Sequence, residues 1–335
     1  MTGWGDLEVR ESEILVSVVC LSYNHKKYIK KSLDSIVGQT LSVPFEIIVH
    51  DDASTDGTTE IVREYANKYP NVTAIIEQEN CYQNGIDFYP IISSRIHGKY
   101  VALCECDDWW CSTDKLQQQF DYMENNPDCS LCVHGVKRFD WSSDRYLSPI
   151  SPSPVERDFS TEEIIEGDGG LFGTNSMFFR ANNYLLPDVF NDWGVGDYPR
   201  TIYLSTLGRV HYSPKLMSVY QVFSEGSWSS KMRDADFHQK QEEEILRGLR
   251  RFDEITCHRY RESIEIRQAV GQLEYSAKFD KRSCLRNAKT IECLKTVSKR
   301  QRMVYLLRII SPSLYQAIKK LKDHISSVHK RGDSR

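Results

Sequence analysis

The sequence lacks the features that mark a membrane-spanning or secreted protein. No run approaches the ~18 apolar residues that a membrane-spanning helix needs. The longest hydrophobic stretches, Ile14–Leu21 and Met303–Ile310, are short and contain polar or charged residues. The first eleven residues are acidic and polar, unlike a signal peptide. We therefore expect a cytoplasmic protein whose thiols are reduced.

Two common nucleotide-binding motifs are also absent. The 335 residues contain no Gly-x-x-x-x-Gly-Lys-Ser/Thr loop, which argues against a P-loop protein. No Gly-x-Gly-x-x-Gly follows the first predicted strand, which disfavours dinucleotide binding.

The ten cysteines do not form a zinc-finger pattern. Cys129 and Cys132 have the spacing of a zinc-ligand pair, and Cys104 and Cys106 lie close together, but no second pair follows at zinc-finger spacing. The residues around Cys129 are typical of a buried strand. We interpret these cysteines as small buried thiols and keep a structural zinc as the less favoured alternative.

Charge is unevenly distributed along the chain. Residues 298–335 contain ten basic and two acidic residues, a net charge of +8, so the first 297 residues carry −12. An acidic body argues against nucleic-acid binding, which needs a basic face. The length and the hydrophobic content of 40% fit a globular protein of two units, or of one large unit with an appendage.

Strand and helix patterns alternate in the first half of the chain. Short β-branched runs predict strands, and apolar stripes at helical spacing predict helices between them. The predicted strands are Ile14–Ser22, Phe45–His50, Val72–Glu77 and Lys99–Glu105. The predicted helices are His25–Gln39, a stripe from Ile61 to Tyr69 after a turn at Thr55–Gly57, and a segment within 85–97. This order predicts an α/β fold with a parallel sheet, and ligands beyond the carboxyl ends of its strands.

The second half of the chain changes character at about residue 231. Before it we expect a helix at Ser112–Asn125, a strand at Cys129–Phe139, a loop at Trp141–Arg157, a capping box at Ser160–Glu163, strands at Gly173–Phe179 and Val210–Phe223, and a helix near Tyr198–Leu207. From Lys231 onward strand patterns vanish, and we expect a helical appendage.

Two acidic clusters follow the second and fourth predicted strands. Their carboxylates, Asp51 and Asp52 in one and Glu105, Asp107 and Asp108 in the other, fall at the same edge of the sheet. A divalent cation, Mg²⁺ or Mn²⁺, would compensate such charge and bridge to a substrate's phosphates. The alternative is that these carboxylates cap the following helices.

The residues after the first strand suit a nucleotide base. Tyr23 offers a stacking surface, and Ser22 and Asn24 offer small hydrogen-bonding groups. They predict a base pocket that needs no glycine loop.

Several segments, taken together and in their order along the chain, resemble family 2 glycosyltransferases with the GT-A fold. The resemblance lies in VSVVCLSYNHKKYIKKSLDSIVGQ, EIIVHDDASTDGT and GKYVALCECDDWW, and continues in GTNSMFFR, GDYPRTIYLSTLGRVHYSPKLMSVY and EGSWS. It is greatest to the bacterial subset whose acidic motif reads Glu-Gly-Asp-Asp-aromatic-Trp. It spans roughly residues 14–230, so we predict a GT-A catalytic domain over 1–230 and a helical C-terminal region over 231–335.

The resemblance implies a metal-dependent, inverting transfer from a nucleotide-sugar, expected to be a UDP-sugar. The acceptor would be a hydroxyl of a glycan or lipid-linked glycan in cell-surface polysaccharide synthesis. It also implies that Asp107 binds Mn²⁺ or Mg²⁺, that Glu105 reaches the ribose or the metal through water, and that Asp108 supports the sugar or the metal shell. The donor's base and ribose would be held by Ser22, Tyr23, Asn24, Asp51 and Asp52.

Inversion needs a general base for the acceptor hydroxyl, and the resemblance places Asp197 there. Asp192 and a purely structural helix cap are the alternatives, and capping would lower the pKa of Asp197 and weaken it as a base. Candidate acceptor contacts are Thr174 and the aromatic planes of Trp109, Trp110 and Trp228, for which core packing is the alternative.

The sequence departs from the related subset at one place. Where that subset commonly reads Tyr-Arg-x-His, this chain reads Tyr220-Gln221-Val222-Phe223, which puts metal affinity in doubt. Lys231 or an arginine of the helical region is the candidate to replace the lost positive charge. The departure motivates a second hypothesis, a catalytically impaired nucleotide-sugar-binding subunit. A nucleotidyltransferase is a third, but would usually show a glycine-rich loop after the first strand.

The C-terminal residues predict a basic amphipathic helix. Apolar residues recur beside Arg302, Arg308, Lys319 and Lys320. Such a helix suits the anionic inner face of a membrane, and packing on the body or on a second subunit of a homo-oligomer is the alternative.

Overall fold

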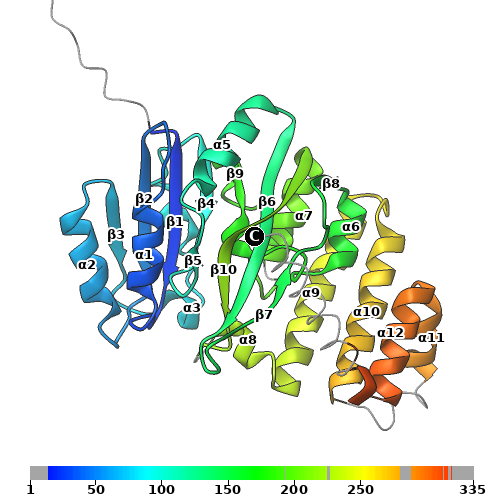
Figure 1. The fold of residues 1–335 in the computed structure, drawn as a ribbon. Coiled ribbons are helices and arrows are strands. Elements are labelled where there is room, and N and C mark those ends of the chain that lie inside the picture. The colour runs from blue at the N-terminus through cyan, green and yellow to red at the C-terminus, as the bar shows by residue number, and fades with distance from the viewer. Residues whose placement is uncertain are drawn as a thin grey trace, which may run out of the picture. The chain divides into compact units, whose positions relative to one another are not determined.

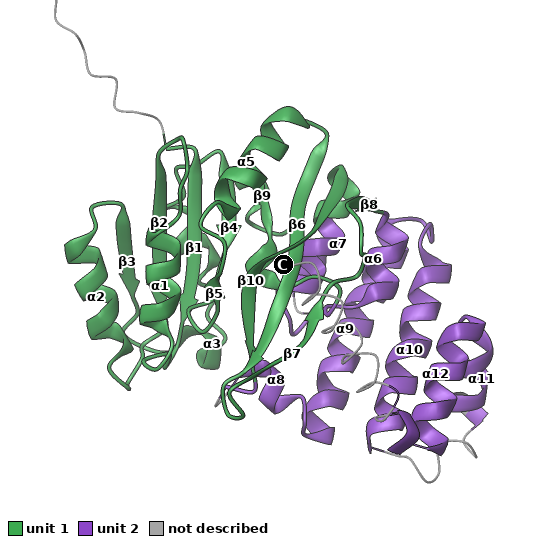
Figure 2. Ribbon diagram, in the orientation of Figure 1, with its two compact units in different colours: residues 1–159, 171–186, 204–222 green, residues 160–170, 187–203, 223–335 purple. Residues whose placement is uncertain are grey.

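The computed structural model describes residues 14–191, 193–224, 227–279, 288–311, 313–315 and 318. The chain forms two compact units, which Figure 2 colours separately. Unit 1 contains residues 1–159, 171–186 and 204–222, and unit 2 contains residues 160–170, 187–203 and 223–335.

Unit 1 is built on a ten-stranded sheet (Figure 1). Its strands are β1 (Val16–Ser22), β2 (Phe45–Asp51), β3 (Val72–Ile76), β4 (Tyr100–Leu103), β5 (Trp109–Trp110), β6 (Cys129–Asp140), β7 (Arg145–Ile150), β8 (Arg157–Phe159), β9 (Phe178–Arg180) and β10 (Arg209–Val222). The order is β3-β2-β1-β4-β9-β6-β10-β5, with β7 beside β6 and β8 beside β10.

Most of the long strands run in one direction. β1 pairs in parallel with β2 and β4, β2 with β3, and β6 with β10. β9 lies antiparallel between β4 and β6, so β6 and β10 run in the direction of β1. The predicted α/β fold with a mostly parallel sheet is therefore confirmed, and six strands place their carboxyl ends at one edge.

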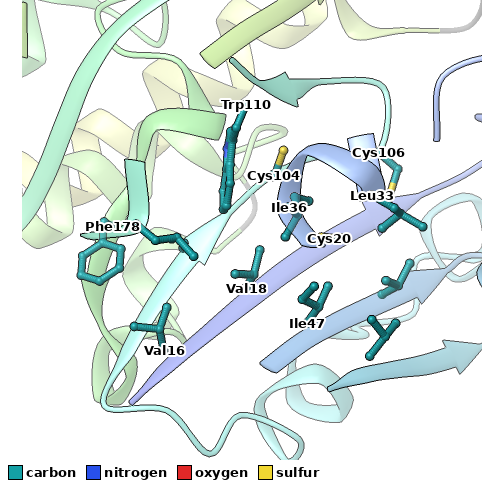
Figure 3. Close-up of a cluster of buried hydrophobic side chains, with 14 of the residues drawn as sticks. Val16, Val18, Cys20, Leu33, Ile36, Ile47, Cys104, Cys106, Trp110 and Phe178 are labelled. Carbon is teal, nitrogen blue, oxygen red and sulfur yellow. The ribbon is translucent and has the colours of Figure 1, made fainter. Parts of the chain in front are cut away.

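Helices cover this sheet because their apolar residues recur at helical spacing. The helices of the unit before β6 are α1 (Ile29–Val37), α2 (Thr58–Lys68), α3 (Cys81–Asn84), α4 (Tyr89–Ser93) and α5 (Lys115–Asn125). Figure 3 shows the core, where Leu33 and Ile36 of α1 pack with strand residues such as Val18 and Ile47. The same cluster includes buried residues of α2 and α5.

Three of the predicted elements take a different form in the structure. The predicted loop Trp141–Arg157 contains β7, which pairs antiparallel with β6. The predicted strand Gly173–Phe179 is a 3-10 helix, Thr174–Ser176, followed by β9. The predicted helix within residues 85–97 is the single short helix α4, which begins at Tyr89 with Pro90 in its first turn.

Unit 2 is helical in its described residues. Its helices are α6 (Thr161–Gly167), α8 (Trp228–Lys231), α9 (Ala235–Ile255), α10 (Arg261–Phe279), α11 (Ala288–Thr296), α12 (Lys299–Ile310) and the start of α7 (Asp197–Leu207), which ends in unit 1. The predicted capping box is confirmed, since Ser160 accepts the Glu163 N–H and Glu163 accepts the Ser160 N–H.

A buried arginine connects the helices of unit 2. Arg267 of α10 donates to both Glu242 oxygens, at 2.7 and 2.9 Å, and to Asp168 Oδ1 at 3.0 Å. The neighbouring carboxylates hold the pKa of Arg267 well above its usual range despite burial. Two segments inside the predicted catalytic domain, residues 160–170 and 187–203, thus belong with the C-terminal helices.

Within the described residues, no helix combines the length and apolar character that crossing a membrane requires.

Candidate active site

The carboxyl ends of β1, β2, β4 and β10 bring polar segments to one edge of the sheet. β1 ends in Ser22, and β2 ends in Asp51, its register partner. Beyond β4, the Cys106 N–H donates to the Leu21 carbonyl, so the acidic segment 105–108 begins beside the end of β1. The residues that we predicted as a donor site from separate motifs are therefore brought together in unit 1.

The loop after β1 is joined to the loop after β2. Asn24 adopts a positive φ of 55°, which Asn tolerates better than most residues. Its N–H donates to Ser54 Oγ at 2.9 Å, and its side-chain oxygen accepts the Thr55 N–H at 2.8 Å. Tyr23 is 38% exposed, whereas Ser22 Oγ is buried with no partner among the described residues.

Asp51 and Asp52 make hydrogen bonds within the protein. Asp51 accepts from the hydroxyls of Ser54 and Thr59, and Asp52 accepts the N–H groups of Cys81 and Tyr82 at the start of α3. The contacts of Asp52 fit the capping alternative, whereas those of Asp51 are to hydroxyl groups. Direct contact of either carboxylate with a donor stays a prediction.

The second acidic cluster includes a histidine whose role the sequence did not reveal. Asp107 is buried, and its Oδ2 lies 4.0 Å from Nε2 of His25. The other ring nitrogen of His25, Nδ1, is buried and has no hydrogen-bond partner in the described part of the chain. No sequence pattern links His25 to Asp107, since 82 positions separate them.

Asp108 is held from two sides. Its Oδ2 accepts from Asn175 Nδ2 at 2.7 Å and its Oδ1 accepts the Gln221 N–H at 2.8 Å. Burial and the neighbouring Asp107 and Glu105 carboxylates raise the pKa of Asp108 well above its usual value, and the two hydrogen bonds oppose this.

Asn175 is a second site residue that the sequence motifs did not single out. It is fully buried, and besides Asp108 it accepts from Ser218 Oγ and donates to the Val219 carbonyl. Its own carbonyl accepts from the indole of Trp110 at 3.1 Å. Asn175 therefore fixes Asp108 relative to β5 and β10. Its place in the segment GTNSMFFR, beside the predicted Thr174, was the signal that could have pointed to it.

Asp107 and His25 are the pair of described side chains nearest to the predicted metal site. Carboxylate oxygens are the ligands that Mg²⁺ and Mn²⁺ prefer, and imidazole is also a ligand of transition metals. Asp107 and His25 supply one ligand of each kind, and Nδ1 of His25 has no hydrogen-bond partner in the described residues. The described residues contain no group of three or more His, Cys, Asp or Glu side chains that could hold a metal ion, so Glu105 as a third ligand stays a prediction. Cys104, Cys106, Cys129 and Cys132 are buried, and no group of three or more possible metal ligands in the described residues includes them.

The tryptophans predicted to contact an acceptor differ in exposure. Trp109 and Trp110 are buried in unit 1, which fits the core-packing alternative. Trp228 is 45% exposed in unit 2, and its indole donates to Gln241 Oε1 at 3.2 Å. Thr174 begins the 3-10 helix before β9.

Asp197 is the first residue of α7 and lies in unit 2. It is half-buried, and its Oδ1 accepts the Tyr198 N–H at 2.7 Å. The next residue, Tyr198, is held by a hydrogen bond from its hydroxyl to the Ile165 carbonyl at 2.6 Å. The alternative base, Asp192, lies outside the described residues.

The departure at residues 220–223 has two structural consequences. The Gln221 side chain is buried, and neither its Nε2 nor its Oε1 has a partner among the described residues. Phe223 adopts a positive φ of 65°, and the Arg233 guanidinium lies 3.8 Å from its ring centroid. An arginine of the helical region thus accompanies the residue that stands in place of the expected histidine.

Comparison with known proteins fits this architecture. The sequence model described as "Glycosyl transferase family 2" matches residues 17–185. An uncharacterised protein of Mycobacterium tuberculosis is 31% identical over 225 residues, 65% of this chain and 62% of that protein, so the match spans about three fifths of the relative's length.

Two further similarities concern proteins with named activities. The Escherichia coli enzyme named UDP-Glc:alpha-D-GlcNAc-diphosphoundecaprenol beta-1,3-glucosyltransferase is 32% identical over 110 residues, 33% of this chain and 41% of that enzyme. A mannosyltransferase from Pyrobaculum calidifontis, solved with GDP-Man and Mn²⁺, superimposes with a TM-score of 0.51 at 16% identity, covering 90% of this chain and 87% of that one. The latter likeness shows the fold.

Proposed function

Because the chain belongs to glycosyl transferase family 2, we propose that it transfers a sugar from a UDP-sugar, with inversion, to a hydroxyl of a glycan or lipid-linked glycan. One observation carries the donor part of this proposal. Ser22, His25 and Gln221 each bury polar side-chain atoms that have no partner among the described residues, at the edge that holds Asp107 and Asp108. Leaving such a group unsatisfied costs roughly 1–3 kcal/mol, so a polar ligand at this edge would offset a substantial cost.

The residues have separate roles in this proposal. Tyr23 would stack on the base, with Ser22, Asn24 and the loop of Asp51 and Asp52 around the nucleoside. Asp107 and Glu105, with His25, would hold Mn²⁺ or Mg²⁺, which supplies positive charge to the diphosphate leaving group when bound. Asp108, fixed by Asn175, would orient the sugar or the metal ligands.

Asp197 would accept the proton of the acceptor hydroxyl at a carboxylate oxygen. General-base help of this kind is typically worth about 10²–10⁴-fold in rate. Support comes from its place at the start of α7 and from the hydrogen bond that the neighbouring Tyr198 donates to the Ile165 carbonyl.

The acceptor class has two lines of support. The name of the Escherichia coli relative specifies a UDP-sugar donor and a lipid-linked acceptor. In α12, Tyr305 and Ile309 are buried whereas Met303 and Ile310 are 67% exposed, so one apolar face is left for a membrane surface or a second subunit. Flotation with vesicles containing anionic lipid tests this, and sedimentation of the protein away from the vesicles would exclude it.

The donor proposal is tested by thermal unfolding with UDP-glucose, UDP-GlcNAc and GDP-mannose, each with Mn²⁺ or EDTA. A donor at ~100 times its Kd stabilises by about 2.7 kcal/mol, a shift of several degrees in Tm. We expect a UDP-sugar to give this shift, and Asp107→Asn to remove its Mn²⁺-dependent part, while the exposed control Asp121→Asn retains it.

Transfer is tested separately with Asp197→Asn. This variant should keep the donor-induced Tm shift and lose donor hydrolysis or transfer by about 10²-fold or more. If no nucleotide-sugar shifts Tm, the donor proposal fails. If donors bind but the unmodified protein shows no turnover with any divalent metal, the impaired-subunit hypothesis replaces it.

A further inference from the structure

The hairpin between β6 and β7 carries a cluster of aromatic side chains in unit 1. Phe139 lies at its centre, with ring centroids 5.8 Å from Trp109, 5.9 Å from Trp141 and 5.0 Å from Tyr146. Tyr28 packs edge-on against Trp141 at 5.5 Å. We call these five residues the hairpin aromatic patch. Trp141 is 43% exposed and Tyr146 60% exposed, so two of its rings are open to solvent.

A lysine lies over this patch without an acidic partner. The Lys31 ammonium is 3.5 Å from the Trp109 ring centroid and 5.8 Å from that of Trp141. It forms no ion pair with any residue that the structure describes. Partial burial among the rings lowers the pKa of Lys31. The patch therefore presents apolar ring faces around one uncompensated cation.

The patch belongs to the edge where the donor residues lie. Phe139 is the second-last residue of β6, and its register partner in β10 is Gln221. β6 runs in the same direction as β1, so the carboxyl ends of both strands lie at the same edge of the sheet. Ser22 is the last residue of β1, and Trp141 directly follows the last residue of β6. Lys31 is on α1, which the same loop from Ser22 to Tyr28 introduces.

The chemistry of the patch selects a carbohydrate that bears negative charge. Aromatic rings present flat apolar faces that suit the C–H faces of a pyranose. A cation at a ring face that lacks a carboxylate partner suits a phosphate or carboxylate substituent. We propose that the hairpin aromatic patch binds the acceptor, an anionic glycan unit, with Trp141 and Tyr146 stacking on the sugar and Lys31 pairing with its acidic group.

This inference rests on the proposed function in one respect, that the bound glycan is the acceptor of the transfer. The test of sugar binding does not depend on the donor. Saturation-transfer NMR titrations with methyl β-D-glucoside and with D-glucuronic acid measure sugar binding directly. We expect both to bind, and Trp141→Ala to weaken both by about three- to tenfold, while Trp141→Phe retains most of the affinity. Lys31→Gln should weaken glucuronic acid more than the neutral glucoside.

Val155→Ala, which alters another exposed apolar side chain of unit 1, is the matched control and should bind both sugars normally. Equal affinities in Trp141→Ala and the unmodified protein would overturn the proposal. So would absence of sugar binding together with a lower sedimentation coefficient in Trp141→Ala, which would assign the patch to a second copy of the chain. If sugars bind at the patch but UDP-sugars do not shift Tm, only the proposed function fails.

Discussion

At the residue scale, His25 is the addition that the structure makes to the predicted metal ligands. Its Nε2 is 4.0 Å from Asp107 Oδ2, and two metal–ligand bonds of ~2.1 Å span up to about 4.2 Å. We expect His25→Ala to weaken Mn²⁺ binding in the presence of UDP by about tenfold or more. Electron paramagnetic resonance of free Mn²⁺ measures this without any turnover.

His97→Ala is the matched control, because His97 is exposed and paired with Glu46. Unchanged Mn²⁺ affinity in His25→Ala would remove His25 from the ligand set and leave Asp107 and Glu105 as the predicted ligands.

Lys115 gives a prediction of pH dependence. It is fully buried beside the Trp110 ring, and burial lowers its pKa to about 7. In the unfolded chain a lysine stays protonated to about pH 10.4. Between about pH 7 and pH 10.4 the unfolded chain therefore binds more protons, and the free energy of unfolding rises with pH by up to about 1.4 kcal/mol per unit.

Lys115→Met should flatten this rise. Urea denaturation at pH 7, 8 and 9 measures it, and Lys30→Met, an exposed lysine on α1, should leave the slope unchanged. Parallel curves for Lys115→Met and the unmodified protein would show that the Gln119 and Trp110 contacts keep Lys115 charged when folded.

At the element scale, the parallel strands were predictable because each is a short β-branched run between turn residues. The first four strands were found within three residues at each end. β7 was missed because its sequence, RYLSPI, contains a proline and lies in a serine-rich segment. Only its pairing with β6 makes it a strand, and pairing is a tertiary property.

The candidate site also contains residues that the sequence predicted and residues that only the tertiary structure shows. The acidic clusters were visible because their residues are contiguous with strand ends. The supports of Asp108 were not, since Asn175 and Gln221 are 67 and 113 positions away. Nor did the sequence show that Asp51 accepts from a hydroxyl of its own loop or that Asp52 accepts from the start of α3.

Asn175 makes hydrogen bonds to Asp108, β5 and β10, so its replacement should lower the stability of the fold. Asn175→Ala would leave Asp108, Ser218 and the Val219 carbonyl without a buried partner, so we expect a loss of about 2–4 kcal/mol in the free energy of unfolding. Urea denaturation measures it. The exposed Asn84→Ala is the control, and a loss below that of the control would mean that water replaces the amide.

At the scale of the whole molecule, the second unit is discontinuous in sequence. α6 packs on α10, where Ser263 donates to Glu166 and Arg267 to Asp168. A chain ending after residue 230 would lack α9 and α10, so α6 and the start of α7 should lose their packing. We expect it to lose cooperative thermal unfolding and to be cleaved rapidly by trypsin within residues 160–203.

A chain ending after Ser311, which keeps both long helices, should behave like the full chain in the same circular-dichroism and proteolysis measurements. Cooperative unfolding of the shorter chain, with residues 160–203 protected, would instead support an independent domain over residues 1–230.

The same discontinuity bears on how relatives of this enzyme can diversify. Asp168 precedes β10 in the sequence and Arg267 follows it, so a single gene crossover between them would separate these two ion-pair partners. Inheritance of a new helical half would therefore require three segments to be exchanged together. Natural variation in this half should proceed by paired substitutions rather than by shuffling of modules.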